Sequence, residues 1–544
     1  MKWDQEFDVV VTGSGGAGLT AAILAHDNGA RVVVLERTDK IGGTTAVSGG
    51  AIWVPMNDHM SEVEVTDSRE EALAYCKKIS AGTASDEMIE TFIDTAPEMV
   101  RYLEEHTPLR FTVWRTPDYY AGEPGGKPCG RSLEPEVFNK KELGDWADRL
   151  RPAPVLMVPL TLDEMFTKYR LMTGIENFPM DLVMERIQSQ VVGMGGALIG
   201  GLLKGCLDRG ISVLVETRAR ELLRENGRVA GVRAESEGTD ARLRARGGVV
   251  LASGGFEWNR ELVSKFIPGP LEYPNSPPFN DGDALLMATE AGADLANMTS
   301  AWWQPSGVVP GEEYEGRPLG RFISSERLAP HTILVNRFGE RFVNEGIPYN
   351  DMGRVFHQFD PATHSFRNLP CWSIFDRQYR RRYPVLTVMP GDPDPEWLTR
   401  DDTLEGLAQK AGIEPTGLTA AVERWNAFVA ESCDSDFRRG SGAFERAAGD
   451  PRLPMPNLGT IEEPPFYALP VYRGALGTSG GPRTNSKGQV VSVQGNVIPG
   501  LYGAGNAIAS PTGIGYYSGG GTIAPAMTWG YICGINAAAE IRRN

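Results

Sequence analysis

A glycine-rich turn near the start of the chain constrains the fold more than any other feature. Residues 8–11 form an apolar run that predicts a buried strand, and residues 19–25 predict a helix. Between them lies Gly13-Ser14-Gly15-Gly16-Ala17-Gly18, and a second apolar run at 32–35 closes on Glu36. This order is a βαβ unit with GxGxxG in its turn. The sequence therefore predicts that a dinucleotide binds at this turn.

The residue types of this turn suit a pyrophosphate. Glycine lets the backbone approach the phosphates closely, and a helix N-terminus offers free N–H groups and the positive end of a dipole. Glu36 stands where a carboxylate accepts hydrogen bonds from a ribose 2′-hydroxyl and repels a 2′-phosphate. The expected contacts are Gly13, Ser14, Gly15, Gly16, Ala17, Gly18 and Glu36.

Length and charge narrow the class of protein. At 544 residues the chain is too long for one core, so we expect two or three domains. A net charge of −16 disfavours nucleic acid or an anionic membrane as the main partner. No apolar window is long enough for an integral membrane segment, and the acidic start does not resemble a signal peptide. We therefore expect a cytoplasmic protein.

The cysteines and histidines show no pattern of a disulfide framework or a metal site. The six cysteines are scattered without CxxC pairs, and the six histidines show no HExxH spacing. Scattered thiols of this kind are typical of a reduced compartment. We expect no metal.

A second stretch rich in glycine and hydroxyl groups, residues 37–50, follows Glu36. It could be an ordinary loop, but beside a pyrophosphate small residues permit close approach and hydroxyls can bond phosphate or an isoalloxazine edge. The stretch resembles the flavoprotein subunits of fumarate reductase and succinate dehydrogenase, in which it wraps FAD. In several of those relatives a histidine near this point joins the flavin covalently, and none stands here, so we expect non-covalent FAD. The expected contacts are Arg37, Gly43, Thr44, Thr45, Ser48, Gly49 and Gly50.

Two later segments return to the same site. A predicted strand at 248–252 ends in small residues. Near the C-terminus a strand at 500–503 enters glycine and asparagine, and a glycine-rich turn then leads into a helix predicted over 524–542. These segments add the expected contacts Ala252, Ser253, Gly254, Gly505, Asn506, Thr522 and Ile523.

Between these segments the composition changes near residue 301, and the chain is then less helical and richer in proline, arginine and aromatic residues to about 475. A return to one site after so long a segment requires an insertion rather than a tandem array. We predict the α/β class, with a Rossmann-like FAD-binding domain (a parallel sheet with helices) interrupted by an inserted α+β catalytic domain. The predicted parts are 1–300 and 478–544 for the FAD-binding domain, and 301–477 for the insert.

Three further motifs sharpen the resemblance. They are PDYY at 117–120, RFVNEGIPY at 341–349 and LYGAGN at 501–506. With the nucleotide turn and the glycine-rich stretch 513–527, they resemble the 3-ketosteroid Δ1-dehydrogenases nearly end to end. This family is a branch of the fumarate reductase flavoproteins. The resemblance implies steroid breakdown, with a small apolar cyclic ketone as substrate and a quinone or carrier as external electron acceptor.

The resemblance also implies catalytic roles for three tyrosines and a glycine. The Tyr516 hydroxyl and the Gly520 N–H would hold the ring carbonyl oxygen, and Tyr349, assisted by Tyr119, would take a proton from the adjacent carbon. The flavin N5 would take hydride from the β-carbon. A C–H beside a ketone is a poor acid until the enolate oxygen is stabilised. An unperturbed tyrosine titrates near about 10, so Tyr349 needs a partner or a field that lowers its pKa.

Some details depart from the family pattern. A one-residue slip in the last turn would assign the carbonyl to Tyr517 and Gly521 instead. The segment 307–329 is longer than the family leads us to expect and lies where a lid or pocket wall would be. Three tryptophans are bulky enough to narrow the pocket for a smaller ring such as a cyclohexanone, and they are Trp114, Trp302 and Trp303.

Several alternatives stay open. The first is desaturation of a monocyclic ketone, or the reverse reduction of an enone. A dicarboxylate reductase is disfavoured because fumarate reductases carry an arginine where Tyr349 stands, and Arg354 is out of register. A non-catalytic flavin electron carrier would need no proton acceptor. No second GxGxxG unit indicates a nicotinamide site, and the oligomeric state is open.

Overall fold

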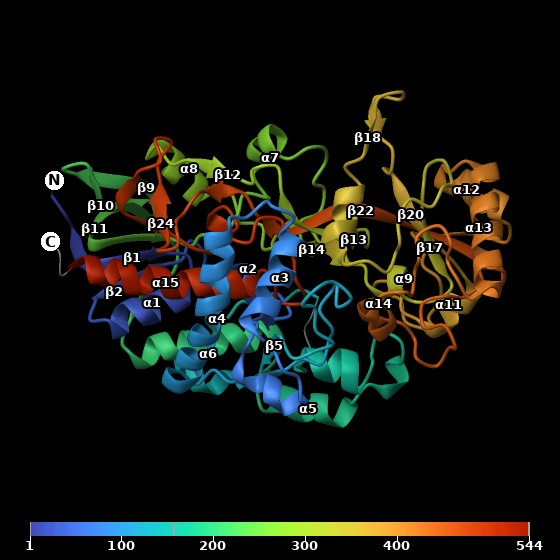
Figure 1. The fold of residues 1–544 in the computed structure, drawn as a ribbon, viewed down its shortest axis with the longest axis horizontal. Coiled ribbons are helices and arrows are strands. Elements are labelled where there is room, and N and C mark those ends of the chain that lie inside the picture. Colours follow the sequence, from blue (N-terminus) through green and yellow to red (C-terminus); the bar gives the residue numbers. More distant parts are fainter. Residues whose placement is uncertain (1, 156–157, 542–544) are drawn as a thin grey trace.

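The computed structural model describes residues 2–155 and 158–541 and contains two main sheets. One sheet, built from both ends of the chain, lies on the left in Figure 1, and the other, built from the middle, lies on the right. The chain is a mixed α/β protein with a parallel sheet, as the sequence predicted.

The first sheet grows from the predicted βαβ unit. Strand β1 (Gln5–Thr12) pairs in parallel with β2 (Val32–Leu35), and helix α1 (Gly16–Asp27) connects them. The inner residues of both strands are fully buried because the sheet is covered on both faces. Helix α1 is buried along most of its length, since α15 (Ile523–Ile541) packs against it through Gly530 and Gly534.

Strands distant in sequence complete this sheet. The order is β24-β25-β11-β1-β2-β8, in which β11 (Thr239–Leu251), β25 (Val497–Gly503) and β8 (Ser212–Leu214) run parallel to their neighbours. Strand β24 (Gln489–Val491) is antiparallel. Strands β9 (Thr217–Glu225) and β10 (Arg228–Ser236) form a hairpin that pairs with β11.

Helices pack beside this sheet. They include α3 (Arg69–Ser80) and α4 (Asp86–His106), each with a serine side chain capping its N-terminus. Helices α6 (Met194–Asp208) and α8 (Asp283–Glu290) follow later in the chain. Arg542, the predicted end of the last helix, lies outside the described residues.

The second sheet is built from the middle of the chain. Its order is β16-β13-β22-β20-β17, with β13 (Ala301–Gly307), β16 (Arg321–Phe322), β17 (Thr332–Asn336), β20 (Cys371–Asp376) and β22 (Phe466–Thr478) all paired antiparallel. Helices α12 (Leu404–Ala411) and α13 (Pro415–Ala430) cover one face through a core around Trp425. The chain leaves the first sheet after β11 and returns at β24, and the domain boundaries near 300 and 478 stay a prediction.

Other structural features bear on the class of protein. Within the part of the chain that the structure describes, no helix is both long and apolar enough to cross a membrane. In the same part, no three His, Cys, Asp or Glu side chains gather as a metal ion requires. The six cysteines are all unpaired.

The glycine turn offers a test of the packing between β1 and α1. A Cβ at Gly18 would lie 2.0 Å from the carbonyl oxygen of Gly13, whereas a Cβ at Gly15 would meet nothing nearer than 3.8 Å. We expect Gly18→Ala to lower the free energy of unfolding by about 1–3 kcal/mol through overpacking. Gly15→Ala, the matched control, should leave it nearly unchanged. Urea denaturation of the cofactor-free proteins measures both, and equal midpoints would contradict this account.

Candidate active site and cofactor cavity

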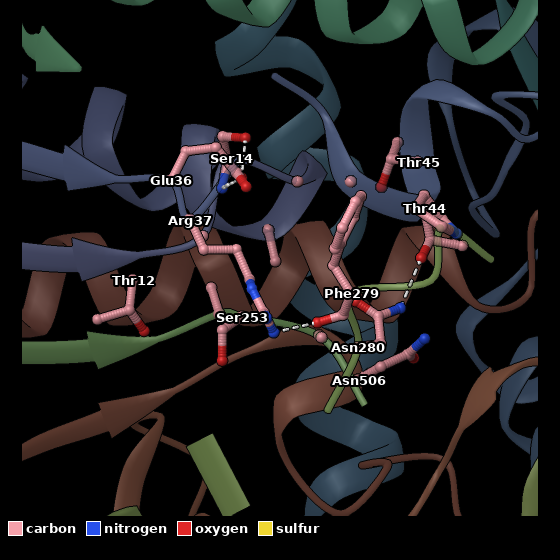
Figure 2. A pocket seen from close by; sticks show the side chains of 18 of the residues that line it. Thr12, Ser14, Glu36, Arg37, Thr44, Thr45, Ser253, Phe279, Asn280 and Asn506 are labelled. Carbon is pink, nitrogen blue, oxygen red and sulfur yellow. Dashed lines mark hydrogen bonds between the residues drawn. The ribbon is translucent and has the colours of Figure 1, made fainter. Parts of the chain in front are cut away.

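A cavity opens where strands β1, β2 and β11 end, at the N-terminus of helix α1 (Figure 2). This is the edge at which open α/β sheets bind their ligands. Of the residues expected from the sequence to contact the cofactor, the following line it: Gly13, Ser14, Gly15, Gly16, Ala17, Glu36, Arg37, Gly43, Thr44, Thr45, Ser48, Ala252, Ser253, Gly254, Gly505, Asn506, Thr522 and Ile523.

Three expected residues lie outside this lining. Gly18 packs the start of α1 onto Gly13, as described above. A Cβ at Gly50 would lie 2.4 Å from the backbone of Met194, and one at Gly49 would lie 3.2 Å from Leu162. These three glycines therefore serve close packing behind the cavity rather than its surface.

The turn after β1 is held in place by Glu36. Its carboxylate accepts a hydrogen bond of 2.6 Å from the Ser14 hydroxyl and one of 3.0 Å from the Thr38 hydroxyl. Figure 2 shows Glu36 beside Ser14 at the edge of the cavity. In addition to its expected role toward a ribose, this carboxylate thus fixes the glycine turn to the end of β2.

The chemistry of the lining fits a dinucleotide. No side chain caps the N-terminus of α1, and among the described residues the N–H groups of Gly15 and Ala17 have no protein acceptor. The space beside Gly15 is open, so phosphate oxygens can approach these N–H groups at the positive end of the helix dipole. Thr45 is uncharged, and its hydroxyl accepts a hydrogen bond of 3.2 Å from the N–H group of Gly16.

Several lining residues were not found from the sequence. Asn280 donates to the Thr44 hydroxyl at 3.1 Å, and Phe279 lies below the guanidinium groups of Arg37 and Arg151. These residues belong to loops without a recognisable motif, so only the fold brings them to the cavity. The other lining residues that the sequence did not predict are Thr12, Leu35, Thr38, Thr217, Arg218, Ala219, Pro277, Asp283, Met287, Leu476 and Ala526.

A hairpin of the long segment 307–329 reaches this cavity. It consists of β14 (Glu313–Tyr314) and β15 (Arg317–Pro318), and Glu315 at its tip pairs with Arg151 at 2.5 Å. Arg151 is 2% exposed and also donates to the Thr38 hydroxyl at 2.8 Å. The hairpin therefore braces one wall of the cofactor cavity.

Three tyrosines expected to be catalytic meet in one cluster. The hydroxyl oxygens of Tyr349 and Tyr516 are 2.5 Å apart. The ring centroid of Tyr119 lies 5.9 Å from that of Tyr349 and 5.8 Å from that of Tyr516. Trp302, from β13, packs on Tyr516 and its indole N–H donates to Asn506 at 3.0 Å. The cluster therefore joins segments from the start, middle and end of the chain.

The cluster separates two cavities. Trp302 and Leu476 of the cluster line the cofactor cavity. Tyr119, Tyr349 and Phe444 of the cluster line a second cavity, which is mostly apolar. The other residues of this second cavity are Trp114, Arg115, Thr116, Phe166, Thr167, Arg170, Met172, Thr173, Phe322, Ser324, Ser325, Arg327, Leu328, Ala329, Ala447, Ala448 and Gly449.

Tyr516 and Tyr517 face different surroundings. Tyr517 is fully buried against Trp53 and Phe92, and its hydroxyl bonds to that of Ser80 at 2.9 Å. Tyr516 instead belongs to the tyrosine cluster. Gly520, four residues after Tyr516, has a φ of +93°, and its N–H has no acceptor in the described part of the protein. This placement favours Tyr516 and Gly520 over Tyr517 and Gly521.

The surroundings raise the pKa values of all three tyrosines, although some neighbours act in the opposite direction. Burial and the neighbouring Tyr119 raise the pKa of Tyr349 well above its ordinary value, while the hydrogen bond from Tyr516 and the charge of Arg327 lower it. Burial likewise raises the pKa of Tyr119 and of Tyr516. A phenolate at this position therefore depends on the few neighbours that stabilise negative charge.

The three tryptophans proposed to narrow the pocket behave differently. Trp114 lines the second cavity, and its ring packs so closely on Gly519 that a Cβ there would lie 2.1 Å from a ring carbon. Trp302 lies in the tyrosine cluster. Trp303 points the other way along the same strand, as alternation requires, and packs against His357 and Arg473. The expectation for Trp303 was therefore wrong.

Comparisons with known proteins assign this cavity to a cofactor. A family model described as FAD binding domain matches residues 8–523. The chain belongs to this FAD-binding family. A 3-oxosteroid 1-dehydrogenase of Mycolicibacterium smegmatis is 38% identical, and the match covers 98% of each chain. A 4-oxocyclohexanecarboxylate 2-dehydrogenase of Sinomonas cyclohexanicum is also 38% identical, over 98% of this chain and 93% of that protein.

A solved structure agrees with this assignment. The 3-ketosteroid Δ1-dehydrogenase of Sterolibacterium denitrificans, in complex with 1,4-androstadiene-3,17-dione, is 36% identical and has a TM-score of 0.91, with 98% of this chain and all of that chain covered. The resemblance drawn from the sequence is thus confirmed. This member of the FAD-binding family is an FAD-dependent oxidoreductase.

The hairpin at the cofactor cavity allows a test of FAD retention. Glu315→Gln removes the charged partner of Arg151, and hydrogen bonds to charged groups contribute about 1–3 kcal/mol. We expect the dissociation constant of FAD to rise roughly 5–150-fold, measured by flavin fluorescence, because each 1.4 kcal/mol is a factor of about ten. Glu312→Gln, on the same segment, breaks only the pair with Arg321 and serves as the control. Equal FAD affinity in both variants would refute a bracing role for the hairpin.

Proposed function

We propose that this protein desaturates a cyclic ketone at the α and β carbons, and that its substrate is a 3-ketosteroid that gains the Δ1 double bond. Two observations support the proposal. The relatives named above include 3-oxosteroid 1-dehydrogenases matched over nearly their whole length. The tyrosine cluster lies between the FAD cavity and an apolar cavity, with the Tyr349 and Tyr516 hydroxyls 2.5 Å apart.

The arrangement of the cluster carries this proposal. Tyr119 and Tyr349 line the second cavity, and the Tyr516 hydroxyl lies 2.5 Å from that of Tyr349. A ketone bound in this cavity would therefore contact Tyr349 and have Tyr516 close by. The Tyr516 hydroxyl and the unbonded N–H of Gly520 are donors for a carbonyl oxygen that gains negative charge. Donors already in place require little reorganisation as the enolate forms.

Tyr349 is the proposed proton acceptor. Its hydroxyl lies next to the proposed carbonyl donor, so it can reach the carbon beside that carbonyl. Tyr119 packs edge-on against it and assists by orienting its ring. Bound FAD supplies the acceptor for the hydride that leaves the β-carbon. The buried, aromatic surroundings exclude water from the reacting carbons.

A second substrate class has support of its own. The 4-oxocyclohexanecarboxylate 2-dehydrogenase is as similar to this chain as the steroid enzyme, at 38% identity. Trp114 occupies the wall beside Gly519, which narrows the cavity. A monocyclic ketone, or reduction of its enone in the reverse direction, is therefore the alternative.

The remaining alternatives have weaker support. Arg354 donates to the carbonyl of Ile514 at 3.1 Å and does not line the second cavity, so it is not placed as a dicarboxylate clamp. Of the three arginines that do line it, Arg115 pairs with Asp163, Arg170 is exposed, and Arg327 donates to the backbone carbonyls of Glu345 and Ile347. A pure electron carrier would have no use for the paired phenols. A quinone or carrier protein as electron acceptor, a non-covalent flavin and a cytoplasmic location stay proposals drawn from the sequence.

The proposed base gives a direct test. Tyr349→Phe removes the proton acceptor while keeping the ring, so we expect anaerobic reduction of bound FAD by 4-androstene-3,17-dione to slow by about 100–10,000-fold. Bleaching of the flavin absorbance measures it. An electron carrier predicts no change between the variant and the wild-type protein.

The wild-type protein also distinguishes the substrates. Bleaching by 4-androstene-3,17-dione supports the steroid, and bleaching by 4-oxocyclohexanecarboxylate alone supports the smaller ring. Bleaching by neither ketone, with FAD still reducible by dithionite, would overturn the proposed function.

The two adjacent tyrosines allow a second test. Tyr516→Phe removes the carbonyl donor, and loss of one such donor costs about 100–1,000-fold in turnover. Tyr517→Phe loses hydrogen bonds with Ser80 and Cys76, which lie outside the tyrosine cluster, so turnover should persist while stability falls by about 1 kcal/mol. Stopped-flow reduction and thermal unfolding separate the two effects. The reverse pattern would assign the carbonyl to Tyr517.

A further inference from the structure

Arg327 is a buried cation beside the proposed base. It belongs to the short helix α9 (Ser325–Leu328), within the segment 307–329 whose length the sequence left unexplained. The residue is 0% exposed, yet it lines the second cavity together with Tyr119 and Tyr349. Its Cζ lies 6.0 Å from the ring centroid of Phe322, which packs on Tyr349 at 5.2 Å.

The hydrogen bonds of Arg327 tie it to the loop that carries Tyr349. Its Nη1 donates to the carbonyl oxygens of Glu345 at 2.6 Å and Ile347 at 2.8 Å. Its Nε and Nη2 are buried without a partner. The side chain therefore fixes the backbone just before Tyr349 but leaves much of its own charge unsatisfied.

Two other deeply buried arginines of this protein have carboxylate partners. Arg131 pairs with Asp67 at 2.6 Å and Asp118 at 2.9 Å, and Arg439 pairs with Glu345 at 3.3 Å. No carboxylate in the described part of the chain lies within ion-pair distance of Arg327. Burying an unpaired charge is costly, so a negative charge that forms beside it is strongly stabilised.

The charged and titratable groups around Tyr349 leave Arg327 as the cation that faces it. Asp351 accepts a hydrogen bond from the Tyr120 hydroxyl and lies 3.6 Å from Arg354. Burial lowers the pKa of Arg354. Glu345 is engaged by Arg341 and Arg439. The remaining groups are Tyr119, Tyr516 and Glu326, and the last is bonded to the backbone N–H groups of Ser324 and Leu386.

We propose that Arg327 is a positioning residue that stabilises the phenolate form of Tyr349, and so makes a buried tyrosine an effective base. This inference rests on the proposed function. Tyr349 loses its proton to solvent before the substrate binds, and the positive charge of Arg327, which lines the same cavity, stabilises the phenolate that results. The phenolate oxygen then forms an O–H bond as the substrate α-C–H breaks. The electron pair moves to the carbonyl oxygen held by Tyr516 and Gly520, and it would return to form the C=C bond as the β-carbon gives up hydride, for which bound FAD would be the acceptor.

The electrostatics agree with this geometry. Burial lowers the pKa of Arg327 to about 10. Electrostatic attraction to Tyr119, and then to Tyr349, acts in the opposite direction and raises it. The same charge lowers the pKa of Tyr349. A nearby opposite charge commonly moves a pKa by about 1–3 units.

Charge and hydrogen bonding at position 327 can be separated. Arg327→Gln keeps N–H donors for the two carbonyls but removes the charge, whereas Arg327→Lys keeps the charge. We expect the acid limb of the pH profile of kcat/KM to move about 1–3 units upward in Arg327→Gln, since its phenolate is less stable. Arg327→Lys should restore most of this shift. The reaction is reduction of bound FAD by whichever ketone bleaches the wild-type protein.

A matched control is available at Arg473. This arginine is also 0% exposed and without an ion pair among the described residues, but it stacks on Trp303, away from the tyrosines. Arg473→Gln should lower stability without moving the pH profile. An equal profile in wild type and Arg327→Gln, with wild-type turnover intact, would overturn the inference while leaving the proposed function standing. Loss of wild-type turnover itself would instead overturn the proposed function.

A spectroscopic readout does not depend on turnover. Tyrosinate absorbance is titrated in the holoprotein and in Tyr349→Phe, and the difference between the curves reports ionisation of Tyr349. The same difference is then measured in the Arg327→Gln background. We expect its midpoint to rise by about 1–3 units, and an unmoved midpoint would contradict the proposal.

Discussion

The antiparallel pairing of β13 with β22 is the contact on which the site depends. In chain order, β13 is the first strand of the second sheet and β22 is the last, and Ala301 lies opposite Thr478 where they pair. The segment between them therefore leaves and returns at one point beside the FAD cavity. Trp302 extends from this pairing to Asn506, which fixes the sheet relative to the cofactor edge. A shift of one residue would turn Trp302 away and remove a wall of the tyrosine cluster.

Burial and charge act against each other throughout this site. The aromatic cluster removes water from the reacting carbons, but the same burial raises the pKa of every phenol in it. Stabilisation of negative charge then has to come from fixed groups, because mobile water is excluded. In the proposed mechanism two places hold this charge, namely the donors at Tyr516 and Gly520 and the guanidinium of Arg327.

Sequence patterns predicted the parts of this fold whose residues follow one another directly in the chain. The strand predicted at 32–35 is β2, and the glycine turn forms the cofactor edge because strand, turn and helix follow directly in the chain. Gly49 and Gly50 carry the same composition signal but pack behind the cavity. Phe279, Asn280 and Arg151 line it from loops that no motif marks. Trp303 was misplaced because the direction of a strand residue depends on register, which the sequence pattern left undetermined.

The tyrosine cluster was accessible from sequence only through family resemblance. Tyr119, Tyr349 and Tyr516 lie far apart in the chain, and no spacing rule connects them. Arg327 shows the limit of that approach, since nothing in its neighbours distinguishes it from a surface arginine. Only the structure shows that it is buried, unpaired and bonded to the loop before Tyr349. A cation retained in such a place costs stability in the resting protein. That cost is offset when a phenolate forms beside it, which gives the burial of Arg327 a physical reason.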